Sequence, residues 1–143
     1  MTHQYDPKSV IMTLGAIPIS GLADGTFVTV ENNEDAFALQ IGADGEGTRS
    51  RTNNDSAKIT LTLTQASASN DALSALHELD KAFPGGAGVV PFFLRDLLGT
   101  ASFFAQSAWI SKRPKAEFGI DAGTREWVIE TDKLVPFDGG SLT

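Results

Sequence analysis

Alternation of apolar and polar residues is the clearest pattern along this chain, and it predicts a mainly β protein. The best example is the run from Lys58 to Gln65, where Ile59, Leu61 and Leu63 point to one face and threonines point to the other. A shift of one residue would expose the three apolar side chains, so the register of this strand is well specified. We expect this strand to lie in the centre of the fold.

Six further short runs rich in β-branched and aromatic residues predict strands at 9–14, 26–31, 36–41, 89–98, 101–112 and 126–135. Asp24-Gly25 is a turn signal, so we expect the first two runs to form a hairpin with a long connection. The run at 89–98 is apolar on both faces, which is typical of a strand covered on both sides, with the helix described next as one cover.

One segment, Asn70 to Phe83, follows the spacing of a helix instead. Ala72, Leu76, Leu79 and Phe83 form an apolar stripe, and the Pro-Gly-Gly that follows ends the helix. We expect Ser69 or Asn70 to cap it, with Asp71 favourable in the first turn. With no internal repeat and no domain boundary visible, the expectation is a single domain over residues 1–143, a β-sandwich or barrel with one packed α-helix.

A long polar segment, residues 43–57, precedes the clearest strand and is predicted to be a loop. Ordering each residue of such a loop costs roughly 1–2 kcal/mol of conformational entropy. We therefore expect a contact outside the folded core to order it.

Composition and charge narrow the classes of protein. The chain has 143 residues with a net charge of −7, from 18 acidic and 11 basic residues, which argues against tight binding of nucleic acid. No apolar run approaches the roughly 20 residues of a membrane span, and the first residues show no secretion signal. The absence of cysteine removes disulfide and thiolate chemistry.

The search for catalytic or metal-binding residues finds no convincing set. The chain has two histidines, and His77, on the predicted helix, has no serine and carboxylate near it in sequence. Glu126, Glu130 and Asp132 share one face of the last predicted strand, which is more typical of a solvated acidic face than of a glycosidase pair. We expect no enzyme activity, no cofactor and no metal.

A series of short motifs nevertheless resembles a known family, the tail tube proteins of contractile-tailed bacteriophages. The matching pieces occur in order over nearly the whole chain, with the weakest match at 136–143: Tyr5–Lys8, Ile19–Phe27, Gly42–Gly45, Thr48–Ser50, Ile59–Leu63, Ser69–Asp71 with Leu73-Ser74, Pro91-Phe92, Arg95-Asp96, Ala108–Ile110 and Thr124–Trp127.

The resemblance implies a tube-type β-sandwich or barrel, shared with tube proteins of type VI secretion systems and tailocins. It further implies hexameric rings that stack into a tube, through which DNA passes without specific binding. The implied partners are other copies of the chain, a contractile sheath, and baseplate, initiator and terminator proteins. The implied location is the virion tail, after synthesis in the host cytoplasm, and no membrane binding by the subunit is implied. The main alternative is a secreted ring protein of a type VI system or tailocin, and a small hydrolase or sugar-binding β-sandwich is the least favoured.

Two sets of residues are candidate assembly sites under this interpretation. The polar segment becomes a hypothetical inter-ring arm, in which Arg49 and Arg51 pair with carboxylates of the next ring, from the region of Asp44 and Glu46 or from that of Glu126 and Glu130. The uncharged face formed by Thr60, Thr62 and Thr64 is compatible either with a lumen lining or with an ordinary solvated sheet face.

Overall fold

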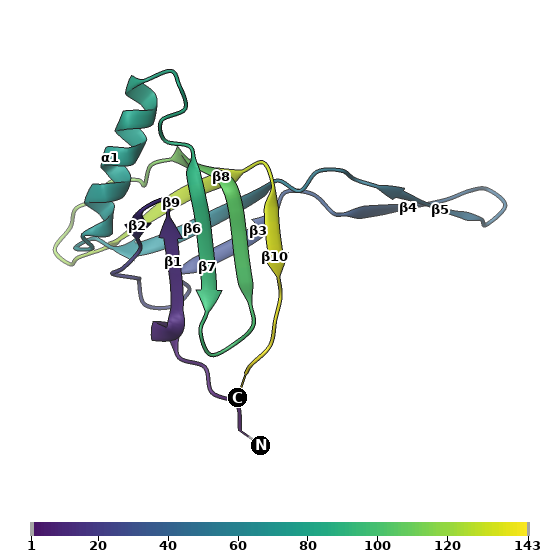
Figure 1. The fold of residues 1–143 in the computed structure, drawn as a ribbon, viewed down its shortest axis with the longest axis horizontal. Coiled ribbons are helices and arrows are strands. Elements are labelled where there is room, and N and C mark those ends of the chain that lie inside the picture. Colours follow the sequence, from purple (N-terminus) through teal and green to yellow (C-terminus); the bar gives the residue numbers. More distant parts are fainter. Residues whose placement is uncertain (1, 143) are drawn as a thin grey trace.

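The structure is a computed structural model that describes residues 2–142. Within these residues an eight-stranded sheet, a two-stranded hairpin and one α-helix make up the fold (Figure 1). The strands are β1 (Val10–Leu14), β2 (Ile17–Pro18), β3 (Val28–Asn32), β4 (Phe37–Ile41), β5 (Gly47–Arg51), β6 (Ala57–Thr64), β7 (Val90–Asp96), β8 (Ser102–Lys112), β9 (Thr124–Thr131) and β10 (Leu134–Phe137). The helices are α1 (Ser69–Ala82) and a short 3-10 turn, η1 (Pro7–Ser9). The predicted mainly β class with one helix is confirmed.

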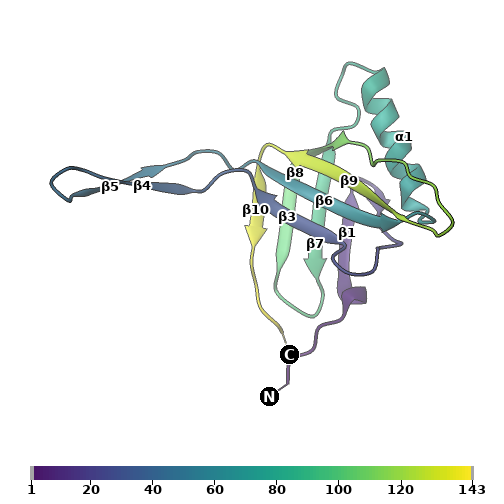
Figure 2. The same cartoon turned by 180° about the vertical axis from the view of Figure 1, so that it is seen from behind.

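The sheet folds over on itself into two layers, and β8 belongs to both (Figures 1 and 2). Residues 102–105 of β8 pair with β7 on one side and β10 on the other, whereas residues 108–112 pair with β9. The register shifts between residues 105 and 108 of β8 in its pairing with β7, and between residues 110 and 112 in its pairing with β9; such bulges bend a strand and increase its twist. The strand order is β2-β1-β7-β8-β9-β6-β3, with β10 beside β8.

The core lies between the two layers. Ile59, Leu61 and Leu63 of β6 are fully buried, which confirms the predicted register. They pack in one cluster with Phe92 of β7 and Trp127 of β9. Burial of side chains of this size stabilises a fold by roughly 1.5–3 kcal/mol each, so β6 is a major source of stability.

The helix α1 closes one end of the body near β2, and its buried face differs from the predicted stripe. Leu73 is fully buried and Leu76 packs on the core, whereas Leu79 and Phe83 are 44% and 57% exposed. The predicted cap is also wrong, because the residue before the helix is Ala68, which makes no side-chain cap bond. The side chain of Ser69 bonds instead to the backbone of residues 18 and 20.

Three further expectations about strands are wrong. The first two predicted strands form no hairpin, because β1 pairs with β2 and β7 while β3 pairs with β6. The run predicted over 126–135 is two strands, β9 and β10, separated by a turn. Only one face of β7 is buried, since Phe92 and Leu94 face the core while Pro91 is exposed.

Among residues 2–142, no helix has the length and apolar character needed to cross a membrane.

Candidate assembly surface

A β-hairpin projects from the body of the protein, formed by β4 and β5 (Figures 1 and 2). We call residues 33–56 the arm. At its base, the Asn33 backbone N–H donates to the Ser56 carbonyl at 3.0 Å, and the Asn33 amide donates to the Ser56 hydroxyl at 2.9 Å. Farther out, the Thr52 N–H donates to the Ala36 carbonyl at 2.8 Å. These bonds hold the two chains of the arm side by side where it leaves the body.

The tip of the arm is a tight turn over residues 42–46. The Gly42 N–H donates to the Glu46 carbonyl at 2.8 Å, and the Asp44 carboxylate accepts the Glu46 N–H at 3.2 Å. Gly45 has a φ of +91°, a backbone conformation that residues with a side chain rarely adopt.

The loop predicted over 43–57 is wrong over residues 47–51, because these residues form β5. These residues contain no apolar side chain, and their strand forms by pairing with β4.

The two faces of the arm differ in chemistry. Register pairs place Phe37 opposite Arg51 and Leu39 opposite Arg49, so these side chains share a face with Ile41. Phe37, Leu39 and Ile41 are 44%, 71% and 59% exposed. The other face carries small and polar side chains: Ala38, Gln40, Thr48 and Ser50. Contiguous exposed apolar side chains are typical of an interaction surface.

The arm also carries four charged residues singled out from sequence: Asp44, Glu46, Arg49 and Arg51. Arg49 and Arg51 lie on β5, with their guanidinium carbons 4.1 Å and 6.0 Å from the centroid of the Phe37 ring. Neither arginine forms an ion pair within residues 2–142, and Asp44 and Glu46 lie apart from them at the tip. The apolar anchors on β4 were not recognised as a site from sequence. Their alternation at positions 37, 39 and 41 was visible, but their exposure depends on β4 pairing only with β5.

The threonine face of β6 points away from the core. Thr60, Thr62 and Thr64 are each partly buried, and their register partners on β9 are Val128, Glu126 and Thr124. The carboxylates of Glu126 and Glu130 therefore lie on the same outer face as the threonines. Lys58 adds a positive charge to this face, opposite Glu130.

The strands β3 and β10 each have one edge that is unpaired within the described chain. β3 ends the strand order and pairs only with β6, and β10 pairs only with β8. Beside the β10 edge, Val135 lies opposite Phe104, and these side chains are 54% and 42% exposed. Unpaired strand edges are templates for pairing with another chain, so these edges are candidate subunit contacts.

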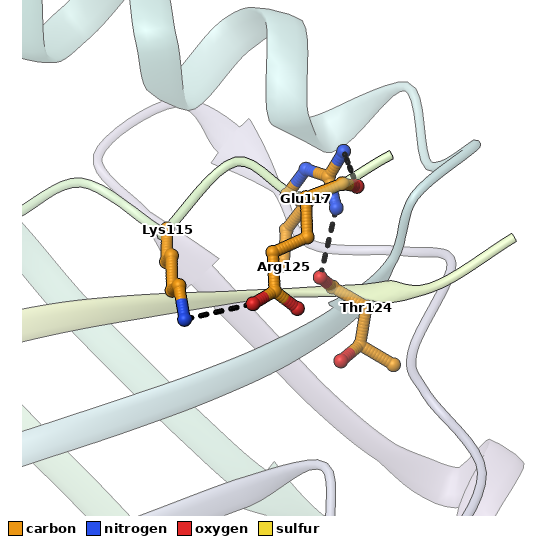
Figure 3. A network of polar contacts seen from close by, with 4 residues as sticks. All are labelled: Lys115, Glu117, Thr124 and Arg125. Carbon is orange, nitrogen blue, oxygen red and sulfur yellow. Dashed lines mark hydrogen bonds and ion pairs between the residues drawn. The ribbon is translucent and has the colours of Figure 1, made fainter. Parts of the chain in front are cut away.

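A polar cluster lies at the other end of the body, in the connection between β8 and β9 (Figure 3). Lys115 and Glu117 form an ion pair with 2.8 Å between Nζ and Oε1. The hydrogen bond and charge of Lys115 hold the pKa of Glu117 below its usual range, and Glu117 in turn raises the pKa of Lys115. The Arg125 guanidinium donates to the carbonyls of Thr124 and Glu117. Within residues 2–142 no group of three or more His, Cys, Asp or Glu side chains is placed to hold a metal ion.

An open-edged sheet with a projecting apolar arm is typical of a structural subunit that assembles with other chains, and comparison with known proteins agrees. The family described as bacteriophage PhiTE tail tube protein matches residues 13–136. Structural protein ORF10 of Pseudomonas phage KPP10 is 30% identical over 146 residues, covering 98% of this chain and 84% of that protein. The chain belongs to this family of phage tail tube proteins.

Solved structures of contractile injection systems share the fold. The sheath-tube complex of the extracellular contractile injection system PVC, in its extended state, contains a chain that matches with a TM-score of 0.60 and 11% identity. That match covers 97% of this chain and 93% of the other. The tube-terminating cap of the anti-feeding prophage matches with a TM-score of 0.59 and 12% identity, over 96% of this chain and 93% of the other. At such low identity these matches show a common fold.

Proposed function

We propose that this protein is the tail tube subunit of a contractile phage tail, with a structural and non-enzymatic role. Copies join into hexameric rings, the rings stack into a tube, and DNA passes through the lumen into the host. The observation that carries this proposal is the arm, whose apolar side chains Phe37, Leu39 and Ile41 stay exposed among residues 2–142. A two-stranded hairpin alone is marginally stable in water, so a second chain is expected to cover it.

Ring formation would use the unpaired sheet edges. Pairing the β3 edge of one copy with an edge of the next, such as that of β10, removes both edges from solvent. A contact between two different edges is heterologous, and it closes into a ring when its rotation divides a full circle.

Stacking of rings would use the arm. Phe37, Leu39 and Ile41 would be buried against a subunit of the neighbouring ring, while Arg49 and Arg51 meet its carboxylates. The candidate carboxylates are Asp44 and Glu46 at the tip, and Glu126 and Glu130 on the β9 face. A guanidinium stacked on an aromatic ring keeps its N–H edge free for a carboxylate, so the contact with Phe37 is compatible with this role.

The outer face of β6 would line the lumen. Thr60, Thr62 and Thr64 form an uncharged polar column with Glu126 and Glu130 beside it. Carboxylates repel phosphates, so such a wall would let DNA pass without holding it. A contractile sheath would surround the tube, and baseplate, initiator and terminator proteins would bind its ends. The subunit would be made in the host cytoplasm and would reside in the virion tail.

A tube protein of a type VI secretion system or tailocin is the alternative, and the fold shared with injection-system structures is compatible with it. The 30% identity to a phage structural protein over nearly the whole chain favours the phage tail. Neighbouring genes for capsid and tail completion would distinguish the two settings.

Negative-stain electron microscopy of the purified protein across a concentration series, with and without tail-initiator complexes, tests the proposal. We expect hollow tubes of uniform diameter. The informative variant replaces residues 37–51 with two glycines, because the Thr52–Ala36 hydrogen bond shows that the flanking residues are adjacent. This variant should fold but form no long tubes. Monomers of the intact chain, even with initiator present, would contradict the proposal and favour a binding module or enzyme.

A further inference from the structure

A small cavity is lined by residues from the start of α1, the start of β9 and the connection after β8. These three segments lie at the end of the body opposite the arm (Figure 1). The volume of the cavity is about 190 Å³. Six polar or amphipathic side chains contribute to its wall: Gln65, Asn70, Ser74, Arg113, Arg125 and Trp127. We call it the arginine pocket.

Arg125 is a buried cation with no carboxylate at ion-pair distance within residues 2–142, and its guanidinium carbon lies 5.2 Å from the centroid of the Phe118 ring. Its side chain is part of a residue only 9% exposed, and it forms no ion pair within residues 2–142. Its Nη1 and Nη2 atoms donate to the carbonyls of Thr124 and Glu117, at 3.0 Å and 3.3 Å (Figure 3). The Glu117 carboxylate is instead held by Lys115. A buried charge is costly unless it is paired, and the Glu117 carboxylate acts on this guanidinium only weakly, from beyond ion-pair distance, so Arg125 has no direct carboxylate partner within residues 2–142.

Arg125 lines the pocket and keeps hydrogen-bond donors that its two bonds do not use. A guanidinium has five N–H groups, and two hydrogen bonds leave three of them free. Within residues 2–142, the one solvent-excluded side-chain nitrogen or oxygen without a hydrogen-bond partner is Nδ1 of His77. Arg125 Nε makes no hydrogen bond within residues 2–142 and is therefore not excluded from solvent, and the Arg125 side chain lines the pocket.

Two other features make the pocket attractive to an anion. Arg113 adds a second guanidinium to the wall. Asn70 and Ser74 belong to the first turns of α1, the end at which the helix dipole is positive. Guanidinium groups bind carboxylates with paired hydrogen bonds, and a volume of about 190 Å³ holds a side-chain head group better than a drug-sized ligand.

We propose that the arginine pocket binds a carboxylate presented by a second copy of this chain. The donor we assign is the acidic segment, residues 31–35, where Glu31, Glu34 and Asp35 are all exposed and form no ion pair within residues 2–142. The acidic segment lies at the base of the arm, on the side of the body away from α1 (Figures 1 and 2). Two complementary sites at opposite ends of one molecule give a head-to-tail contact. The choice of a second copy as the donor rests on the proposed assembly.

The first test measures the pocket without any assembly. In dilute Trp109→Phe protein, Trp127 is the remaining tryptophan, and its Nε1 donates to Asn70 at the pocket wall. We expect its fluorescence to change saturably with sodium acetate, relative to sodium chloride at equal ionic strength. Arg113→Gln should weaken this binding at least tenfold, whereas Lys112→Gln, which removes an equal charge outside the wall, should leave it unchanged. No fluorescence response to acetate, or equal responses in the two variants, would contradict carboxylate binding in the arginine pocket.

The second test identifies the donor by cross-linking. The chain has no cysteine, so a variant with Ala36→Cys and Ala116→Cys carries a thiol beside the acidic segment and another on the pocket wall. Oxidation of assembled protein should give a ladder of multimers on a non-reducing gel. Ala87→Cys paired with Ala116→Cys is the control and should give none. Acetate binding without a ladder in assembled protein would show that the acidic segment of a second copy is not the donor. If tubes form but neither the fluorescence change nor the ladder is seen, this inference is wrong and the proposed function still stands.

Discussion

In the arm, the guanidinium carbon of Arg49 lies 4.1 Å from the centroid of the Phe37 ring, on the neighbouring strand. The register partner of Phe37 is Arg51, whose guanidinium carbon is 6.0 Å away, so the ring makes its closer contact with the diagonal neighbour. A cation over an exposed aromatic ring contributes about 0.5–1 kcal/mol. The contact therefore helps to order a hairpin whose two strands pair only with each other.

The apolar face of the arm should be required for assembly but not for folding. Leu39 is 71% exposed, so Leu39→Asp should change the melting temperature little. It should abolish long tubes in electron micrographs, because a carboxylate would be buried in the contact between rings. Gln40→Asp places the same charge on the opposite face of β4 and should still form tubes. Normal tubes from Leu39→Asp would show that this face is not an interface.

The prediction for the lumen uses the absence of cysteine from the chain. Thr62 lies on the outer face of β6, so Thr62→Cys should react in free subunits with both a small maleimide and a bulky polyethylene-glycol maleimide. In tubes, the bulky reagent should react at least tenfold more slowly, since it must enter through the ends, while the small one still reacts. Ala75→Cys, on an exposed position of α1, serves as the comparison. Equal protection of both cysteines would argue against a lumenal position specific to Thr62.

Gly21 is expected to tolerate no side chain. Its φ is +69°, and an added Cβ would lie 2.5 Å from the Ser67 side chain, whose hydroxyl donates to the Ser20 carbonyl. Gly25 has a φ of +86° and open space around the Cβ position, so it isolates the backbone cost of roughly 1–2 kcal/mol. Gly21→Ala should lower the free energy of unfolding by more than Gly25→Ala, as measured by urea denaturation. Equal losses would mean that the contact with Ser67 relaxes freely.

These glycines also illustrate what sequence patterns reveal and what they leave out. The Asp24-Gly25 turn signal is local and the chain bends there, but the partner of each flanking strand is distant in sequence. β1 pairs with β7 and β3 with β6, so pairing depends on contacts that no short pattern records. The register of β6 was predictable because one wholly apolar face leaves a single way to bury Ile59, Leu61 and Leu63.

The candidate sites show the same division. Arg49 and Arg51 were recognisable as unusual cations in an acidic chain, but β5 forms only by pairing with β4, so the segment was predicted as a loop. The arginine pocket could not be predicted from sequence, because Asn70 of α1 is distant in sequence from Arg113 and Arg125. Only the fold places the three residues around one cavity. The predicted helix stripe was wrong in part, since Leu73 rather than Ala72 is buried in the core, whereas Leu76 packs on the core as expected.

The ion pair between Lys115 and Glu117 predicts a specific pH dependence (Figure 3). The pKa of Glu117 is lowered by the hydrogen bond and the charge of Lys115, so the folded state favours the ionised carboxylate. This contribution to stability is present above the ordinary pKa of Glu, about 4.3, and is lost as the pH falls through the lowered value. The pKa of Lys115 is raised, so its share is present below about 10.4 and is lost as the pH rises through the raised value.

Lys115→Gln should therefore raise the pKa of Glu117 toward its ordinary value, which an NMR titration of the side-chain carboxyl group measures directly. The melting temperature near neutral pH should change little, because both side chains are exposed and water screens exposed pairs. Lys112→Gln removes an equal charge from β8 and should leave the titration of Glu117 in place, since the cations that shift this pKa are Lys115 and, more weakly, Arg125. An unchanged pKa in Lys115→Gln would mean that Arg125 rather than Lys115 is the main partner of this carboxylate, and that the buried guanidinium already has its counter-charge.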